Sequence, residues 1–353
     1  MDNWGLTCYP ITIYMKRILS LYTAIFFLFL TAANVAARET SIMGMHVLNP
    51  EEFSAAKNSL LIDGETQDQW YYMTVPLTLN DLNDLPRWQK LFTEARETHV
   101  IPIVRLATRY ENGSWQQPTR KDIVDLITFL QKLEWPTEDR HIIAFNEVNH
   151  SKEWGGEIDP NSYANAFRFT SSWAHAQQAS FIVMPAAMDL AAPNGRSTSE
   201  AFNYLASMYA FDPEIFTYAD AWNSHSYPNP GFSTSPTKTD KMSLRGFEHE
   251  LAFLADKTEN TLPVYITETG WEDSRSTRPW LSSYYEYALQ HIWTKDKVVA
   301  VTPFIYKGSP GPFSGFSFMT ADDKPTEQLD ALRRALAHTF KQSRLLSSVE
   351  SSR

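Results

Sequence analysis

Cysteine is almost absent from this chain of 353 residues, in which Cys8 is the single residue of its type. One cysteine cannot form an intramolecular disulfide. Cys8 also lies upstream of a segment that we interpret as a secretory signal, so the mature chain would have no cysteine. This excludes a thiolate nucleophile and a cysteine-ligated metal from the mature protein. A chain of this length can be stabilised by its hydrophobic core alone.

Positive charge is also scarce, because 31 lysines and arginines face 41 acidic residues and give a net charge of −10. No basic cluster interrupts this balance, so we expect no nucleic-acid partner. No group of histidines and carboxylates has the short spacing of a metal site, and we therefore predict no catalytic metal and no cofactor. A serine esterase is disfavoured because the G-x-S-x-G motif is missing.

Long apolar runs are confined to the N-terminus. Lys16 and Arg17 precede the run "ILSLYTAIFFLFLTAA", and the small-residue stretch "NVAARE" follows it. These are the three parts of a secretory signal, so we expect residues 1–37 to be removed near Ala37 and the protein to lie outside the cytoplasm. The alternative is an uncleaved membrane anchor, since the run is almost long enough to span a bilayer. The residues before Met15 suggest a start codon assigned too early.

Eight short apolar runs alternate with longer stretches of helical spacing after residue 40. The runs are continuous rather than alternating, as in parallel strands that are buried on both faces. They cover residues 41–48, 70–77, 100–107, 141–148, 181–188, 218–227, 262–268 and 298–306. Eight such strand–helix units close into a barrel. An open doubly wound sheet is disfavoured because no Gly-rich phosphate loop follows the first run.

The sequence therefore predicts an α/β protein with a single (β/α)8 TIM barrel over residues 38–342. Residues 343–353, which include "RLLSSVESSR", are expected to form a disordered tail. We find no internal repeat and no second domain, and we expect a monomer. Aromatic residues make up 14% of the chain, which suits sugar binding and equally suits a large core.

Two acids end runs of this barrel. Glu147 lies at the end of "HIIAFNEV", the fourth run, and Glu268 ends "LPVYITE", the seventh. Strand ends of one polarity meet at the barrel mouth, where active sites form in this fold. Each acid alone is more often structural, but a facing carboxylate pair can cleave a glycosidic bond. For a retaining enzyme the two carboxyl groups should lie about 5 to 5.5 Å apart.

The motifs "FNEVN" and "ITETGW" resemble those of the clan A glycoside hydrolases, retaining (β/α)8 enzymes, and families 5 and 39 in particular. The resemblance covers the mature chain as order and motif. It implies that Glu147 is the general acid/base and Glu268 the nucleophile. It also implies that Asn146 hydrogen-bonds the sugar hydroxyl next to the anomeric carbon, and that the substrate is a poly- or oligosaccharide.

The sixth run, "AWNSHSYP", contains the His-x-Tyr pair that the clan has at this place. The resemblance implies that Tyr227 hydrogen-bonds Glu268 and that His225 lies nearer Glu147. The two side chains point to the same side if the segment is extended. A polar loop before Pro228 is the alternative interpretation.

Other expected site residues depart from the clan pattern. The clan has an arginine at the end of its second strand, whereas here the strand-end arginine is Arg105, on the third run. Either the strand count slips, or Arg105 reaches sideways, or it forms a structural salt bridge. In place of the clan's sugar-stacking tryptophan we consider Tyr306 and Trp271, with core packing as the alternative for each. His46, at the end of the first run, either lines the cleft or is a buried structural histidine.

Three functions remain open at this stage. The first is the retaining glycosidase. The second is a barrel that only binds glycan, which would normally have lost one acid. The third is a hydrolase accessory to exopolysaccharide synthesis, which the exported location would suit. The glycan itself depends on loop shapes that the sequence does not reveal.

Overall fold

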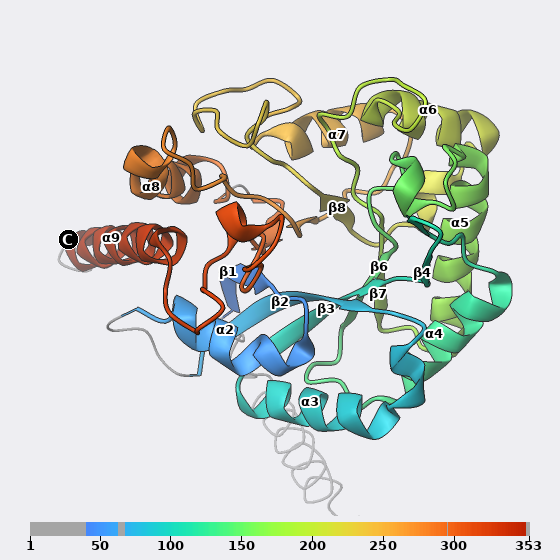
Figure 1. Ribbon diagram of the computed structural model, residues 1–353, viewed down its shortest axis with the longest axis horizontal. Coiled ribbons are helices and arrows are strands. Elements are labelled where there is room, and N and C mark those ends of the chain that lie inside the picture. Colours follow the sequence, from blue (N-terminus) through green and yellow to red (C-terminus); the bar gives the residue numbers. More distant parts are fainter. Residues whose placement is uncertain (1–39, 63–67, 295, 351–353) are drawn as a thin grey trace, which may run out of the picture. The chain divides into compact units, whose positions relative to one another are not determined.

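Eight parallel strands form one sheet in the computed structural model, which describes residues 40–62, 68–294 and 296–350 (Figure 1). The expected signal or anchor lies outside these residues. Within them, no helix is both long and apolar enough to cross a membrane. The strands are β1 (Thr40–His46), β2 (Trp70–Leu77), β3 (Val100–Leu106), β6 (Arg140–Ala144), β7 (Phe181–Pro185), β8 (Trp222–Ser224), β9 (Val264–Ile266) and β10 (Val298–Val301).

The strands follow the order β7-β6-β3-β2-β1-β10-β9-β8, and every neighbouring pair is parallel. The junction between β7 and β8 is closed by an isolated bridge between Asp189 and His225 and by a hydrogen bond from the Asp220 amide to the Val183 carbonyl (3.1 Å). The sheet therefore curls into a nearly closed barrel. The predicted (β/α)8 fold is confirmed.

A helix follows each strand and packs outside it (Figure 1). The helices are α2 (Phe53–Leu60), α3 (Leu85–Glu97), α4 (Arg120–Lys132), α5 (Pro160–Gln177), α6 (Ala201–Phe211), α7 (Gly246–Leu254), α8 (Leu281–His291) and α9 (Glu327–Glu350). Local sequence signals set several of their ends. Thr119 and Asp122 form a capping box at the start of α4, and the Asp159 side chain accepts from the Ser162 amide at the start of α5.

Short elements fill the connections. A two-stranded hairpin, β4 (Tyr110–Glu111) and β5 (Ser114–Trp115), lies between β3 and α4. The 3-10 helices are η1 (Pro50–Glu52), η2 (Asp81–Asn83), η3 (Ser151–Glu153), η4 (Ile215–Tyr218), η5 (Arg278–Trp280) and η6 (Ser314–Phe316).

The hydrophobic core has two parts. The larger part lies between the sheet and the helices, and α4 contributes Ile123, Leu126 and Leu130 to it from one face. The smaller part is a cluster drawn from six of the strands and from Ala221, just before β8, which fills the inside of the barrel: Tyr72, Ile101, Ile103, Ile143, Met184, Ala221, Tyr265 and Ala300. Because the interior is packed, polar chemistry is restricted to the strand ends.

One boundary differs from the sequence-based expectation. The tail expected to be disordered from residue 343 is helical through Glu350, as the end of α9. The reason is local, because no proline or glycine follows Pro325 and nothing in the sequence therefore stops the helix.

Candidate active site

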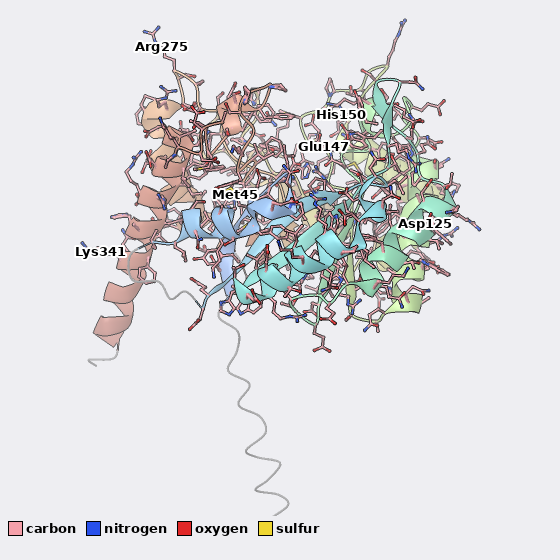
Figure 2. All side chains as sticks on the ribbon, turned by 60° about the horizontal axis from the view of Figure 1, so that its bottom comes forward. Met45, Asp125, Glu147, His150, Arg275 and Lys341 are labelled. Atoms are coloured by element: carbon pink, nitrogen blue, oxygen red, sulfur yellow. The ribbon has the colours of Figure 1, made fainter. Side chains whose placement is uncertain are left out.

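The two predicted acids lie at the carboxyl ends of their strands. Glu147 follows the end of β6 by three residues, and Glu268 follows the end of β9 by two. Phe145 and Glu147 both have positive φ angles, 75° and 32°, so the backbone on either side of Asn146 is in a conformation that L-residues seldom adopt. Such strained positions cluster at functional sites. Figure 2 shows Glu147 beside His150 at one end of the barrel.

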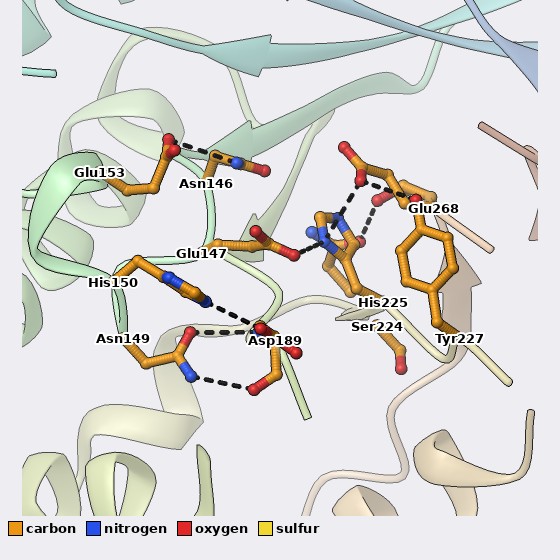
Figure 3. Close-up of polar contacts among 12 residues, drawn as sticks. Asn146, Glu147, Asn149, His150, Glu153, Asp189, Ser224, His225, Tyr227 and Glu268 are labelled. Atoms are coloured by element: carbon orange, nitrogen blue, oxygen red, sulfur yellow. Dashed lines mark hydrogen bonds and ion pairs between the residues drawn. The ribbon is translucent and has the colours of Figure 1, made fainter. Parts of the chain in front are cut away.

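The two carboxylates meet at His225. Its Nδ1 lies 3.0 Å from Oε1 of Glu147 and 3.7 Å from Oε2 of Glu268 (Figure 3). One atom of each of these three side chains lies within 4.8 Å of the others. The predicted acids therefore face one another across the mouth, at close range.

Glu268 is held by donors on both oxygens. Nη1 of Arg105 donates to Oε1 (2.5 Å), and the Tyr227 hydroxyl donates to Oε2 (3.1 Å). Burial alone would raise the pKa of Glu268, but His225 and Arg105 outweigh it and lower the pKa to about 2. The Glu268 side chain is thus ionised over the whole ordinary pH range, although only a tenth of it is exposed.

Arg105 settles the open question about strand order. It lies on β3, the third strand of the barrel, so the strand count holds and the side chain reaches sideways to Glu268. The same Nη1 also donates to Oδ1 of Asn146 (2.8 Å). A single guanidinium nitrogen therefore ties Asn146 to Glu268.

Glu153 is a third acid in this network, and it is absent from the residues expected at the site. Nδ2 of Asn146 donates to Oε2 of Glu153 (3.4 Å). Burial first, and then the charge of Glu147, raise the pKa of Glu153. With Arg105 on its oxygen and Glu153 on its nitrogen, the Asn146 amide has one orientation. In the sequence Glu153 is one acid of a polar loop, without a pattern that marks it.

His46 and His225 are both fully buried at the mouth. Nδ1 of His46 donates to the Thr267 carbonyl (3.2 Å) and lies 3.7 Å from Glu268. Burial, and then Arg105, lower the pKa of His46 to about 3, so its ring is neutral. For His225, burial would lower the pKa, but Glu268 and Glu147 outweigh it and raise the pKa. His46 thus packs beneath Glu268 as a neutral ring rather than lining an open cleft.

Neither predicted sugar platform fits its role. Trp271 is fully buried, donates its indole N–H to the Thr234 carbonyl (2.8 Å) and packs against Tyr284 and Tyr285. Gly270 has a φ of 124°, and this turn sends Trp271 into the core. Tyr306 is only 5% exposed and belongs to the same core. A covered ring offers no face to a sugar, so the expectation is wrong for Trp271, and Tyr306 has almost no free surface.

Phenylalanines occupy the mouth instead. Phe304, just past the end of β10, is partly exposed. Its ring centroid lies 5.2 Å from that of His46 and 5.1 Å from that of Phe313. Phe232 lies 5.0 Å from Tyr227 and 5.0 Å from Phe316. These rings border the Glu268 side of the mouth. The sequence contains the signal, since "TPFIYKGSPGPFSGF" is rich in phenylalanine, but it does not say which ring faces the opening.

Glu147, His225 and Glu268 are also the group whose ligand atoms could meet at a metal ion, among the described residues. Both oxygens of Glu268, however, already accept from Arg105 and Tyr227. A divalent cation there would have to displace the Arg105 guanidinium or lie against its positive charge. The arrangement favours paired-carboxylate chemistry over metal chemistry.

Solved structures share this fold at low sequence identity. The chain is similar to a β-xylosidase from Caulobacter crescentus CB15, with a TM-score of 0.58, 14% identity and coverage of 83% of this chain and 67% of the other. A family GH5_18 protein from Streptomyces cattleya, in complex with GlcNAc, is similar with a TM-score of 0.60 and 13% identity, over 85% of this chain and 80% of the other. An endo-β-1,4-glucanase from Xanthomonas axonopodis pv. citri is similar with a TM-score of 0.52 and 14% identity, over 84% of this chain and 98% of the other. The chain thus spans about two thirds of the xylosidase and nearly all of the glucanase.

No curated protein matches the chain in sequence. The family described as "Glycosyl hydrolase catalytic core" matches residues 112–331, which is more than half of the chain. The match includes Glu147, Glu153, His225 and Glu268, and begins after Arg105. With the barrel and the resemblance in "FNEVN" and "ITETGW", it makes the chain a glycosidase that acts on carbohydrate. The chain belongs to the glycosyl hydrolase catalytic core family.

Proposed function

We propose that the protein is a retaining glycoside hydrolase that cleaves a poly- or oligosaccharide, with Glu268 as nucleophile and Glu147 as general acid/base. The observation that carries the proposal is the separation of the two acids, whose oxygens approach within 4.8 Å. Whole carboxyl groups lie about 5 to 5.5 Å apart in retaining enzymes and roughly 6.5 to 9.5 Å apart in inverting ones, so a nearest-oxygen distance under 4.8 Å suits the retaining spacing better. The short separation supports direct attack by a carboxylate.

The environments of the two acids support the assignment of roles. Glu268 has cations beside it and a pKa lowered to about 2, as a nucleophile that must attack in its ionised form requires. Glu147 has neither the arginine nor the tyrosine, and a fifth of its side chain is exposed. A carboxyl group in that position can exchange protons with the leaving group and with water.

The reaction follows in two steps. In the first, an oxygen of Glu268 attacks the anomeric carbon, the glycosidic bond breaks, and Glu147 gives its proton to the departing oxygen. In the second, Glu147 removes a proton from water, whose oxygen attacks the anomeric carbon and releases Glu268 as a carboxylate. Nδ2 of Asn146 has one hydrogen on Glu153 and a second that can donate to the sugar hydroxyl beside the anomeric carbon. Because developing charge strengthens that bond, Asn146 would stabilise the transition state.

The substrate is proposed to be a β-linked glycan. The fold neighbours include proteins named as a β-xylosidase and an endo-β-1,4-glucanase. These names give a first panel of β-xylosides and β-1,4-glucans and do not decide between them. We also propose that the protein is exported, on the strength of the charged, apolar and small-residue order of residues 15–37. N-terminal sequencing of exported protein should then begin near Arg38.

The stereochemistry of the first product tests the mechanism. We expect proton NMR of the purified mature chain, with an aryl β-glycoside that it turns over, to show the β-anomer first and the α-anomer only after mutarotation. A 2-deoxy-2-fluoro glycoside should label the peptide that contains Glu268, as read by mass spectrometry. An α-anomer as first product, or a label on a different acid, would overturn the proposal.

A further inference from the structure

A histidine–aspartate pair lies next to Glu147 and has no part in the mechanism above. His150 follows β6, and Asp189 follows β7 by four residues. Nε2 of His150 lies 2.8 Å from Oδ2 of Asp189, and the two side chains are 19% and 29% exposed. Figure 3 shows His150 directed toward Asp189 close to the Glu147 side chain. The pair is therefore partly open at the mouth rather than sealed in the core.

The pair is held rigidly by its surroundings. The buried Asn149 accepts from the Asp189 amide (3.1 Å) and donates to the Asp189 carbonyl (3.0 Å). Oδ1 of Asp189 accepts from the Ala191 amide (2.8 Å), which leaves Oδ2 to His150. The His150 amide in turn donates to the Glu147 carbonyl (2.8 Å). These bonds fix the imidazole relative to the acid that handles the leaving group.

The order of the strands shows on which side of Glu147 the His150–Asp189 pair lies. β6, which leads to Glu147, lies between β3 and β7. On the β3 side, Arg105 joins Asn146 to Glu268, so that side surrounds the sugar whose anomeric carbon is attacked. His150 and Asp189 are on the β7 side. A general acid stands at the glycosidic oxygen, between the attacked sugar and the departing one. The β7 side is therefore where the departing sugar would lie.

The chemistry of the ring suits a sugar hydroxyl. The hydrogen bond to Asp189 raises the pKa of His150, with the charge of Glu147 adding to it and burial opposing it. A protonated ring carries hydrogens on both nitrogens. Nε2 donates to Asp189, and Nδ1 makes no hydrogen bond with any residue that the structure describes. In the protonated ring, which the raised pKa favours, an oriented donor thus remains beside the position of the scissile bond.

We propose that His150, held in place by Asp189, forms a subsite for the departing sugar and donates from Nδ1 to one of its hydroxyl oxygens. This inference rests on the proposed function, because the departing side is defined by Glu147 as acid. It predicts that His150 contributes to catalysis only when the leaving group is itself a sugar. It also predicts that an acceptor sugar uses the same subsite when it replaces water in the second step.

Two substrates separate this role from general damage to the site. An oligosaccharide places a sugar in the subsite, whereas the corresponding glycosyl fluoride has a leaving group too small to reach it. A hydrogen bond from a charged donor contributes roughly ten- to hundredfold in kcat/KM. His150→Ala should lower kcat/KM for the oligosaccharide by that factor and change it for the fluoride by less than about threefold. His150→Gln, which keeps a neutral donor, should recover part of the loss.

The chain offers a matched control. His175, near the end of α5, pairs with Asp220 at 2.9 Å, with side chains 37% and 31% exposed, at the opposite end of the barrel. His175→Ala removes a similar pair and should leave kcat/KM unchanged for both substrates. The fraction of product transferred to an added acceptor sugar should fall in His150→Ala and not in His175→Ala.

Each outcome decides between the two proposals. Equal losses on both substrates for His150→Ala, or none on either, would overturn the subsite while leaving the mechanism intact. Inversion by the wild-type protein, or no turnover of the fluoride by it, would instead overturn the proposed function. If His150→Ala fails to fold, His150→Gln and the acceptor measurement give the same decision.

Discussion

Two buried glutamates, one at the barrel mouth and one behind it, are in opposite protonation states at mildly acidic pH. Glu268 is 8% exposed and has a pKa lowered to about 2. Glu250, on the inner face of α7, is fully buried, and burial raises its pKa to about 7. Its Oε2 accepts from the Ser224 hydroxyl (2.5 Å), and its Oε1 has no hydrogen-bond partner among the described residues.

The difference shows that neighbours, not burial, determine the charge at the mouth. Burial pushes the pKa of both acids upward. Glu268 has the Arg105 guanidinium in direct contact and His225 at 3.7 Å, and these reverse the effect. Glu250 has a serine as its hydrogen-bond partner and keeps its proton near neutral pH. Glu268 is thus ionised at the mouth, where the chemistry is proposed, whereas Glu250, on the helix behind it, keeps its proton at mildly acidic pH.

The sharpest test of this contrast removes the ionised member. Glu268→Ala should lower turnover of aryl glycosides by at least about 10⁴-fold, because the proposed covalent step is lost. Added azide should restore part of the rate and give a glycosyl azide of inverted configuration. Glu250→Gln is the matched control and should keep near wild-type turnover. Loss of activity in Glu250→Gln alone would break the contrast.

The partner acid should show a dependence on the leaving group. Glu147→Ala should lower kcat/KM for oligosaccharides by about 10²- to 10⁴-fold, the range of general acid catalysis. It should have a much smaller effect on substrates such as 2,4-dinitrophenyl glycosides, whose leaving group needs no proton. With azide the product should keep the configuration of the substrate. Equal losses for good and poor leaving groups would contradict the role of Glu147 as acid.

Removing the cation should make Glu268 behave more like Glu250. In Arg105→Met, one of the charges that oppose the effect of burial is lost, so the pKa of Glu268 would rise. The acid limb of the kcat/KM profile should then move to higher pH by about one to two units, so the loss of rate should be greatest below about pH 4 and fade toward neutral pH. Arg105→Lys, which keeps the charge, should shift the limb less. A limb that stays in place in both variants would show that Arg105 does not set the charge of Glu268.

The smallest effect concerns stability rather than activity. The raised pKa of Glu250 means that the folded state binds its proton more tightly than the unfolded chain does. The associated stability is fully present below about pH 4.5 and is lost as the pH rises to about 7, a change of about 3 kcal/mol for a shift from 4.5. Urea unfolding of wild type and Glu250→Gln at pH 5 and pH 8 measures this. A difference between the two proteins that is the same at both pH values would contradict the shift.

The parts of the fold that depend on chain-local patterns were predictable, and those that depend on side-chain direction after a strand were not. Continuous apolar runs located the eight strands, and an acid at the end of a run located Glu147 and Glu268. The position of Trp271 differs from the expectation because the turn at Gly270 redirects the chain only two residues after Glu268. Glu153 ends the short helix η3 and Asp189 forms an isolated bridge, and the contacts of Asn146 and Asn149 orient them. No periodicity in the sequence records such contacts.

The seam between β7 and β8 gives the barrel a weak point in its hydrogen bonding. Seven register pairs join β2 to β3, whereas an isolated bridge and the Asp220–Val183 bond span the seam. Local opening is least costly where few backbone bonds must break, so amide hydrogen exchange should be faster along the seam than along β2 and β3. Asp189 follows β7 and His225 follows β8, so the two residues lie on opposite sides of this seam. Local opening between β7 and β8 would widen the mouth next to Glu147, while the β3 side, with Arg105, stays fixed. A product would then leave on the β7 side.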